Sequence, residues 1–97
     1  MIEGRQAVTE DYTVVDLEMT GLTPKQDKII EIGAVKVRGK KVVDTLGTLV
    51  KSARPIPERV SELTGITNEM METGMEEDQA IETLLSFIGE DVIVGHN

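Results

Sequence analysis

Residues 12–22 read YTVVDLEMTGL, and the fold is decided in this stretch. Residues 12–17 are rich in β-branched and aromatic side chains, which predicts a β-strand. Residues 20–24, TGLTP, then end the strand in a loop. Residues two apart on a strand point to the same side, with Cα atoms roughly 6.5 Å apart, so we expect Asp16 and Glu18 on one face.

The carboxylates of Asp16 and Glu18 are candidates for a metal site. Like charges on one face at the end of an apolar strand are unfavourable unless a cation neutralises them or one stays protonated. Mg²⁺ or Mn²⁺ would satisfy both, because hard cations bind carboxylate oxygens and keep positions for water and phosphate. The alternative is that both are solvated charges at a strand end, since an isolated D-x-E pattern is short and common.

Two further strands are predicted after the loop. Residues 28–38, KIIEIGAVKVR, and residues 41–50 have strand character, and Gly39-Lys40 between them predicts a tight antiparallel hairpin. Gly33, inside the first of these strands, predicts either a bulge or a close approach by another element.

The second half of the chain predicts helices and a last strand. One helix is expected from Pro57 to about Leu63, with Gly65 as its stop. Residues 67–75 are ambiguous between a short helix and a loop. A clearer helix follows, in which apolar residues of 80–88 recur at helical spacing, with the acidic residues 76–78 near its N-terminus and Gly89 as its stop. Residues 91–94 predict a short buried strand.

The predicted fold class is therefore α/β, with a three-stranded antiparallel start, two helices and a fourth strand in a mixed sheet covered by helices. The fourth strand should pair beside the first and bring Asn97 towards Asp16. The side chains expected in the core are apolar residues of these elements: Val14, Val15, Ile30, Ile32, Val35, Leu49, Leu63, Ile81, Leu84, Leu85 and Ile93.

Composition limits the possible functions. The chain has 97 residues, with 18 acidic and 10 basic side chains and a formal net charge of −8. This charge argues against nucleic-acid binding by counterion release alone, but not against an enzyme that meets phosphates through divalent cations. No apolar run suits a membrane span or a signal peptide, so we expect a soluble, cytoplasmic chain without a membrane partner. Residues 1–11 are expected to be a tail or an expression scar.

Three blocks of sequence resemble the DEDD superfamily of 3′–5′ exonucleases. Residues 12–22 resemble its first motif, D-x-E-x-T-G. Residues 55–67, PIPERVSELTGIT, closely resemble the next block of proofreading exonucleases of DNA polymerase III type, and residues 94–97, VGHN, resemble the opening of the second motif. Three blocks in the right order are far more specific than D-x-E alone. On this resemblance, residues 12–97 are the N-terminal portion of an exonuclease domain that is incomplete at the C-terminus.

The resemblance implies an RNase H-like fold and a two-metal site, with Mg²⁺ or Mn²⁺, that hydrolyses the terminal phosphodiester of DNA. Asp16 and Glu18 would be the catalytic metal ligands that this chain supplies. His96 is not the family's general base, which lies in a third motif, and we expect a structural role for it. The residues that would hold the 3′-terminal nucleotide or the substrate strand are Met19, Thr20, Gly21, Leu22, Thr64 and Asn97.

Two departures from the family pattern leave alternatives open. Met19 stands where proofreading enzymes usually carry Thr, and DLEMTGL also begins oligoribonuclease-type members, so short RNA is an alternative substrate. Residues 55–67 favour the polymerase III side, with a single-stranded DNA 3′ end and the polymerase subunit or domain as partners. The family's C-terminal half, with two of four carboxylates and the general base, is absent. We therefore expect these 97 residues alone to be inactive and to self-associate; the alternative is a non-catalytic acidic binding or assembly module.

Overall fold

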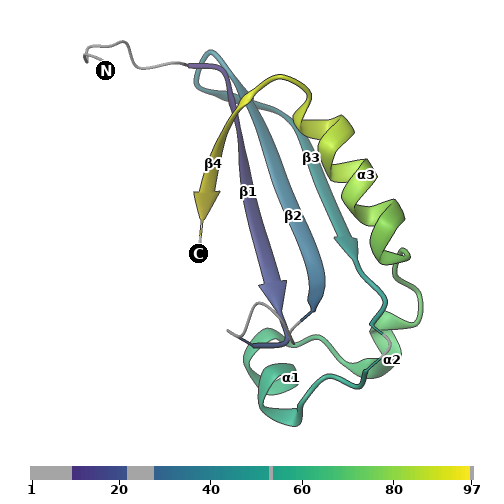
Figure 1. Cartoon of the computed structure of the whole chain (residues 1–97). Helices are drawn as coiled ribbons and strands as arrows, with labels where there is room; N and C mark the ends of the chain where they lie inside the picture. Colours follow the sequence, from purple (N-terminus) through teal and green to yellow (C-terminus); the bar gives the residue numbers. More distant parts are fainter. Residues whose placement is uncertain (1–9, 22–27, 53, 97) are drawn as a thin grey trace.

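The computed structural model describes residues 10–21, 28–52 and 54–96 (Figure 1). Its elements follow the predicted order, and part of the ambiguous segment 67–75 forms a short helix. They are β1 (Tyr12–Met19), β2 (Ile29–Arg38), β3 (Lys41–Leu49), α1 (Glu58–Thr64), α2 (Asn68–Met71), α3 (Glu77–Ile88) and β4 (Val92–His96). The predicted α/β class with a mixed sheet is confirmed.

The four strands form one sheet in the order β3-β2-β1-β4. Strands β1, β2 and β3 are antiparallel neighbours, whereas β4 runs parallel to β1. The β2–β3 hairpin closes through Gly39 and Lys40, which have φ values of 58° and 69°. Two consecutive residues with positive φ are what a two-residue hairpin needs to match the twist of its strands, so the predicted hairpin is confirmed.

The prediction for Gly33 was wrong. The register shifts in the sheet lie between Glu18 and Met19 and between Lys36 and Val37, not at Gly33. A Cβ atom placed on Gly33 would lie 3.7 Å from the Asp16 carbonyl oxygen, which is an ordinary contact. The glycine that the packing does require is Gly74, where a Cβ atom would come within 2.6 Å of the Leu49 carbonyl oxygen.

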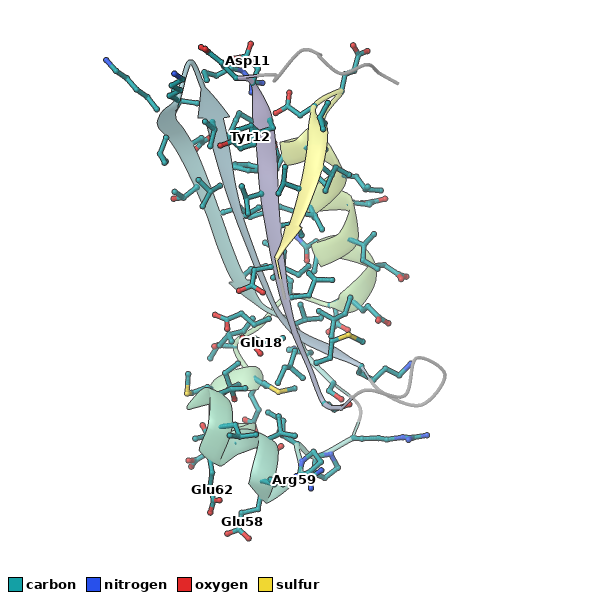
Figure 2. All side chains as sticks on the ribbon, turned by 90° about the vertical axis from the view of Figure 1, so that its left-hand side faces the viewer. Asp11, Tyr12, Glu18, Glu58, Arg59 and Glu62 are labelled. Carbon is teal, nitrogen blue, oxygen red and sulfur yellow. The ribbon has the colours of Figure 1, made fainter. Side chains whose placement is uncertain are left out.

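Helix α3 covers one face of the sheet, and among the described elements no helix covers the other, open face (Figures 1 and 2). Its Ala80 is fully buried with Ile32 of β2 and Val50, and Leu17 of β1 packs against this cluster. The core of this layer therefore lies between α3 and the face of β1 that carries Leu17.

None of the described helices is long and apolar enough to cross a membrane.

Helices α1 and α2 form a separate group below the end of β1 (Figure 1). Helix α1 ends at Gly65, which has a φ of 79°, as the sequence predicted. The Asn68 side-chain oxygen accepts a hydrogen bond of 2.6 Å from the Ile56 amide, which fixes the segment before α1 against α2. These contacts close a second small core made of Ile30, Ile56, Val60, Ile66 and Met71.

The predicted core is confirmed only in part. Ile30 and Ile32 are fully buried, but Leu63, Ile81, Leu85 and Ile93 are 81%, 38%, 60% and 55% exposed. The prediction was wrong for these four because apolar character does not say which face of an element is covered. Helix α3 turns Ala80 and Ile88 to the core, which leaves Ile81 and Leu85 on its flank, and no described element pairs with the outer edge of β4.

A polar cluster fixes the start of β4. The Asp91 carboxylate, 12% exposed, accepts hydrogen bonds of 3.0 and 2.8 Å from the two terminal nitrogens of Arg38. It also accepts bonds of 2.9 Å from Lys36 Nζ and 2.7 Å from the hydroxyl of the fully buried Thr13. Lys36 Nζ lies 5.1 Å from the centre of the Phe87 ring. One carboxylate thereby ties the residue before β4 to strands β1 and β2.

Candidate active site

The carboxylates of Asp16 and Glu18 lie on the open face of the sheet. Strand β1 runs to Met19, two residues further than predicted, so both carboxylates belong to the strand. Their neighbour Leu17 packs towards α3, and alternation along a strand directs Asp16 and Glu18 to the opposite side. Asp16 is exposed and Glu18 is half-buried.

Strand pairing determines the backbone neighbours of Asp16 and Glu18. Asp16 is paired with Gly33 of β2 and with His96 of β4, and Glu18 is directly opposite Glu31. Like charges facing each other across two strands are destabilising. Within the described residues, neither the Asp16 nor the Glu18 side chain has a hydrogen bond or an ion pair. Two uncompensated carboxylates side by side are the electrostatic setting in which a divalent cation binds favourably.

These two residues fit a hard divalent cation as part of a ligand set. Carboxylate oxygens are the ligands that Mg²⁺ and Mn²⁺ prefer, and Mg²⁺ is commonly held by one or two carboxylates together with water and substrate phosphate. The part of the chain that the structure describes contains no group of three His, Cys, Asp or Glu residues that could hold a metal ion. Within the described residues, Asp16 and Glu18 are therefore two candidate ligands of an incomplete set.

A cavity of about 490 Å³ joins the end of β1 to α1. It brings Glu18 together with four of the predicted substrate-binding residues, Met19, Thr20, Gly21 and Thr64. Two blocks that lie far apart in the sequence, residues 17–21 and 59–64, thus form the two walls of one hollow. The predicted residues Leu22 and Asn97 lie outside the described residues. The full lining is Leu17, Glu18, Met19, Thr20, Gly21, Arg59, Val60, Leu63 and Thr64.

The hydroxyl groups of Thr20 and Thr64 shape the backbone around this cavity. The Thr20 hydroxyl accepts a hydrogen bond of 2.9 Å from the Lys28 amide, and the Thr20 amide donates one of 2.9 Å to the Lys28 carbonyl oxygen. The Thr64 hydroxyl donates to the Val60 carbonyl oxygen at 2.8 Å and accepts from the Ile66 amide at 3.1 Å. These bonds hold the two ends of the β1–β2 connection together and close the C-terminal turn of α1.

Sequence reasoning missed Arg59 and Leu63 as cavity residues. They are one helical turn apart on α1, on the side that also carries Val60 and Thr64. Leu63 was assigned to the core, although it is 81% exposed at the cavity wall. For Leu63 a signal was available from helical spacing, because Val60 lies four residues before the predicted contact Thr64 and three residues before Leu63. For Arg59 the sequence offered no such signal.

Strand β4 ends beside Asp16. Its last residue, His96, is the register partner of Asp16, so the predicted arrangement of the first and fourth strands is confirmed. The Asp91 cluster stands at the other end of β4. Parallel pairing fixes the register of a short strand against its neighbour. The position of Asp91 therefore also determines which residue of β1 is paired with His96.

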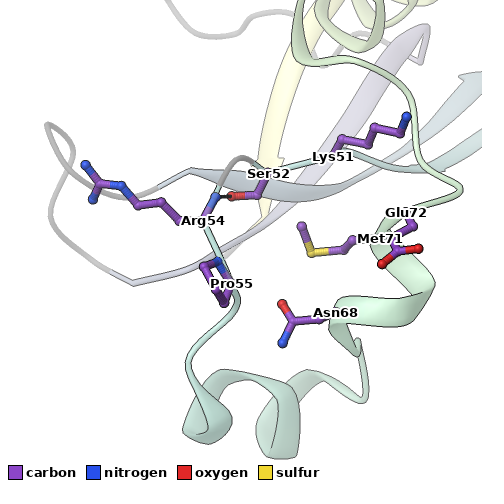
Figure 3. Close-up of a pocket in the computed structure, with 7 residues that line it drawn as sticks. All are labelled: Lys51, Ser52, Arg54, Pro55, Asn68, Met71 and Glu72. Carbon is purple, nitrogen blue, oxygen red and sulfur yellow. Dashed lines mark hydrogen bonds between the residues drawn. The ribbon is translucent and has the colours of Figure 1, made fainter.

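A larger cavity of about 680 Å³ lies between α2 and the segment that follows β3 (Figure 3). Its polar groups do not converge on one point. Lys51 forms an ion pair of 3.5 Å with Glu76, and Figure 3 shows the Arg54 guanidinium directed away from the hollow. The Asn68 oxygen is used by the Ile56 amide. Size alone therefore does not make it the active site; its lining is Lys51, Ser52, Arg54, Pro55, Asn68, Met71 and Glu72.

The fold and the paired carboxylates define the class of protein. A mixed sheet with three antiparallel strands, a parallel fourth strand and helices in this order is the RNase H-like fold of exonucleases. Two solved structures superimpose on it: E. coli exonuclease I in complex with a dT13 oligonucleotide, and exonuclease X in complex with 5′ overhanging duplex DNA. The first has a TM-score of 0.78 at 19% identity over 92% of this chain and 21% of that chain. The second has a TM-score of 0.73 at 29% identity over 89% of this chain and 48% of that chain.

The chain belongs to the RNase T family of exonucleases, whose family model matches residues 13–97. It is 45% identical over 86 residues to the PolC-type DNA polymerase III of Thermotoga maritima, covering 89% of this chain and 6% of that protein. It is 36% identical over 85 residues to the DNA polymerase III subunit epsilon of Aquifex aeolicus, covering 88% of this chain and 42% of that protein. The chain thus spans a small part of the first relative and less than half of the second. The resemblance inferred from the sequence is confirmed.

Proposed function

We propose that this chain supplies the 3′-end-binding walls and two metal ligands of a divalent-metal-dependent 3′–5′ exonuclease acting on DNA. One observation carries the proposal: Glu18 stands beside Asp16 on the open face of β1 and also borders the cavity between β1 and α1. A residue shared by a cation site and a substrate-sized hollow suits hydrolysis of a phosphodiester held in that hollow. The names of the PolC-type and epsilon relatives support a role in proofreading, with the DNA polymerase III polymerase subunit or domain as partner.

The residues of the chain would act by holding the metal ion and by orienting the terminal nucleotide. Asp16 and Glu18 would bind Mg²⁺ or Mn²⁺ through their carboxylate oxygens. When bound, such an ion polarises the attacking water and stabilises charge on the attacking and leaving oxygens. The end of β1 and the cavity-facing side of α1 would place the terminal nucleotide between them, so that its phosphodiester meets the two carboxylates. Holding the reacting groups in this geometry lowers the entropic part of the barrier.

Short RNA is the second candidate substrate, and Met19 is the observation that favours it. Met19 lines the cavity of the proposed site, and proofreading members of the family usually carry Thr at this position. The two substrates differ only by the ribose hydroxyl and the base set, so a direct comparison decides between them.

The test is degradation of matched DNA and RNA oligonucleotides by the complete protein encoded by the reading frame that carries these residues. Each oligonucleotide is labelled at the 5′ end, so that removal of nucleotides from the 3′ end gives a ladder of shortened products. We expect a ladder with DNA in the presence of Mg²⁺ or Mn²⁺, none with EDTA, and none with Asp16→Ala. A ladder that persists in Asp16→Ala would overturn the proposal. Preferential degradation of RNA would overturn the choice of DNA and leave the metal site in place.

We also propose that these 97 residues alone are inactive and associate with a second copy through the outer edge of β4, which no described strand covers. Val92, Ile93 and Val94 are 56%, 55% and 42% exposed, so β4 offers apolar side chains on both of its faces together with a backbone edge that no described strand pairs with. Such edges pair readily with other chains. Sedimentation velocity should therefore show dimers or larger species. A monomer across the accessible concentrations, or nuclease activity that Asp16→Ala removes, would contradict this.

A further inference from the structure

We propose that Arg59 contacts a backbone phosphate of the substrate strand and thereby sets how strongly the cavity holds a 3′ end. This inference rests on the proposed function, since it assigns a further substrate contact to the same site. Arg59 lines the cavity between β1 and α1 together with Glu18 and Thr64, and no sequence motif drew attention to it.

The charge distribution around α1 singles out this residue. Helix α1 reads ERVSELT, with Arg59 as its only cation and with Glu58 and Glu62 as its acids. Arg59 lines the cavity, whereas Glu58 borders a different and smaller hollow. Figure 2 shows all three residues on α1 below Glu18. Among the described residues that line the cavity, Arg59 is the one cation.

Arg59 is also available to a ligand. Its side chain is exposed, and within the described part of the chain it forms no ion pair or hydrogen bond. This differs from Arg38, whose guanidinium is engaged by Asp91. An uncommitted guanidinium can bind a phosphate with two parallel hydrogen bonds, which is the geometry in which arginine exceeds lysine.

A polyanionic substrate needs such a contact here. The chain carries a net charge of −8, and Glu18 adds negative charge to the cavity wall itself. A divalent cation at Asp16 and Glu18 would serve the phosphodiester that is cut, but it does nothing for the next phosphate along the strand. Arg59 lies on the opposite wall of the cavity from the end of β1, one helical turn from Leu63, where a strand leaving the cavity would pass.

The test is the salt dependence of binding, measured by fluorescence anisotropy on the complete protein. The probe is a fluorescein-labelled oligothymidylate of about ten nucleotides, within the range that single-strand sites cover, with Ca²⁺ in place of Mg²⁺ to prevent cleavage. Each phosphate contact to a single strand contributes about 0.7 to the slope of log Kd against log salt. We therefore expect Arg59→Gln to weaken binding and to lower that slope by about 0.7, and Arg59→Lys to keep most of the slope.

The matched control is Arg54→Gln, which removes an exposed arginine outside this cavity and should leave the slope unchanged. In the nuclease assay, Arg59→Gln should raise KM while kcat stays nearly constant, because the contact holds substrate and transition state alike. An unchanged slope in Arg59→Gln, or an equal fall in Arg54→Gln, would overturn the inference. If Asp16→Ala abolishes cleavage and Arg59→Gln leaves slope and KM unaltered, the inference fails and the proposed function stands. If the wild-type protein neither binds nor cleaves the oligonucleotide, both fail.

Discussion

The carboxylates near strand β1 differ in their hydrogen-bond partners. Asp91, just before β4, has several, whereas Asp16 and Glu18 on β1 have none among the described residues. Asp91 receives hydrogen bonds from Thr13, Lys36 and Arg38. Asp16 and Glu18 receive none from the described residues, and Glu18 faces a second acid, Glu31. Since a fold gains nothing from unpaired like charges, the comparison separates a carboxylate that stabilises the protein from two whose position the proposed cation site would explain.

The bonds to Asp91 also appear in its titration. Hydrogen bonds from Arg38, and then from Thr13 and Lys36, hold the pKa of Asp91 well below its usual value of 3.8. The same carboxylate raises the pKa of Arg38 through their hydrogen bond. Asp91 is therefore ionised throughout the physiological range and acts as a fixed anchor for the start of β4.

The largest expected effect is on activity and should separate the two regions. In the complete protein, Asp16→Ala should lower the rate of DNA degradation by at least about 10²-fold, because it removes a ligand of an ion worth several kcal/mol of charge stabilisation. Its unfolding midpoint should be unchanged or slightly higher. Asp91→Asn should retain most of the activity when it is assayed at a temperature well below the midpoint of its own thermal unfolding. Equal losses in the two variants would remove the distinction between them.

The second effect is on stability and should have the opposite pattern. Asp91→Ala leaves Thr13, Lys36 and Arg38 without their shared acceptor. Unmade bonds to buried or half-buried donors are costly. Among single carboxylate-to-alanine changes at described positions, we expect this one to lower the urea midpoint most. Asp44→Ala on the exposed surface of β3 is the matched control, and a midpoint as low as that of Asp91→Ala there would contradict the account.

The third effect is the pH dependence of that stability. Because the folded pKa of Asp91 is depressed, its contribution is complete above the ordinary value of 3.8 and is lost as the pH falls below it. The difference in unfolding free energy between wild type and Asp91→Asn should therefore be constant between about pH 7 and pH 5 and should shrink at about pH 3. Urea titrations at these pH values measure it. A difference that grows on acidification would show that the sign is wrong.

The smallest expected effect is a gain in stability when the charge of Glu18 is removed. Glu18→Gln removes a like-charge pair with Glu31 across β1 and β2, so it should stabilise the fold by about 0.2–1 kcal/mol while it lowers activity. Thermal unfolding without divalent ions measures the gain, and saturating Mn²⁺ should reduce it, since the ion compensates the wild-type repulsion. A destabilised Glu18→Gln would mean that Glu18 serves the fold.

These regions also mark how far the sequence was informative. Periodicity located β1, β2, β3, α1, α3 and β4, because strand alternation and helix stops such as Gly65 are local properties. The position of Asp16 and Glu18 on one face followed from the same alternation. Leu63 and Ile93 were placed in the core wrongly, since burial depends on which elements lie above them. The Asp91 cluster is also non-local, as it joins residues 78 positions apart.

One local signal for the cluster was present in β2. Lys36 and Arg38 are two residues apart and therefore share a face with the buried Ala34. Two cations on a face that α3 covers require an acid, but the sequence alone offered 18 candidates. Arg59 was missed for a related reason: a single cation between two acids on a short helix has no pattern until the cavity shows which side it faces.

The most direct test of the central claim is Mn²⁺ binding, followed by the loss of the free-ion EPR signal in wild type, Asp16→Ala and Asp91→Asn of the complete protein. If the unpaired carboxylates of β1 form the cation site, wild type and Asp91→Asn should remove Mn²⁺ from solution with similar affinity, and Asp16→Ala should bind it far more weakly. Undiminished binding in Asp16→Ala would contradict the account, because the ion would then be held elsewhere.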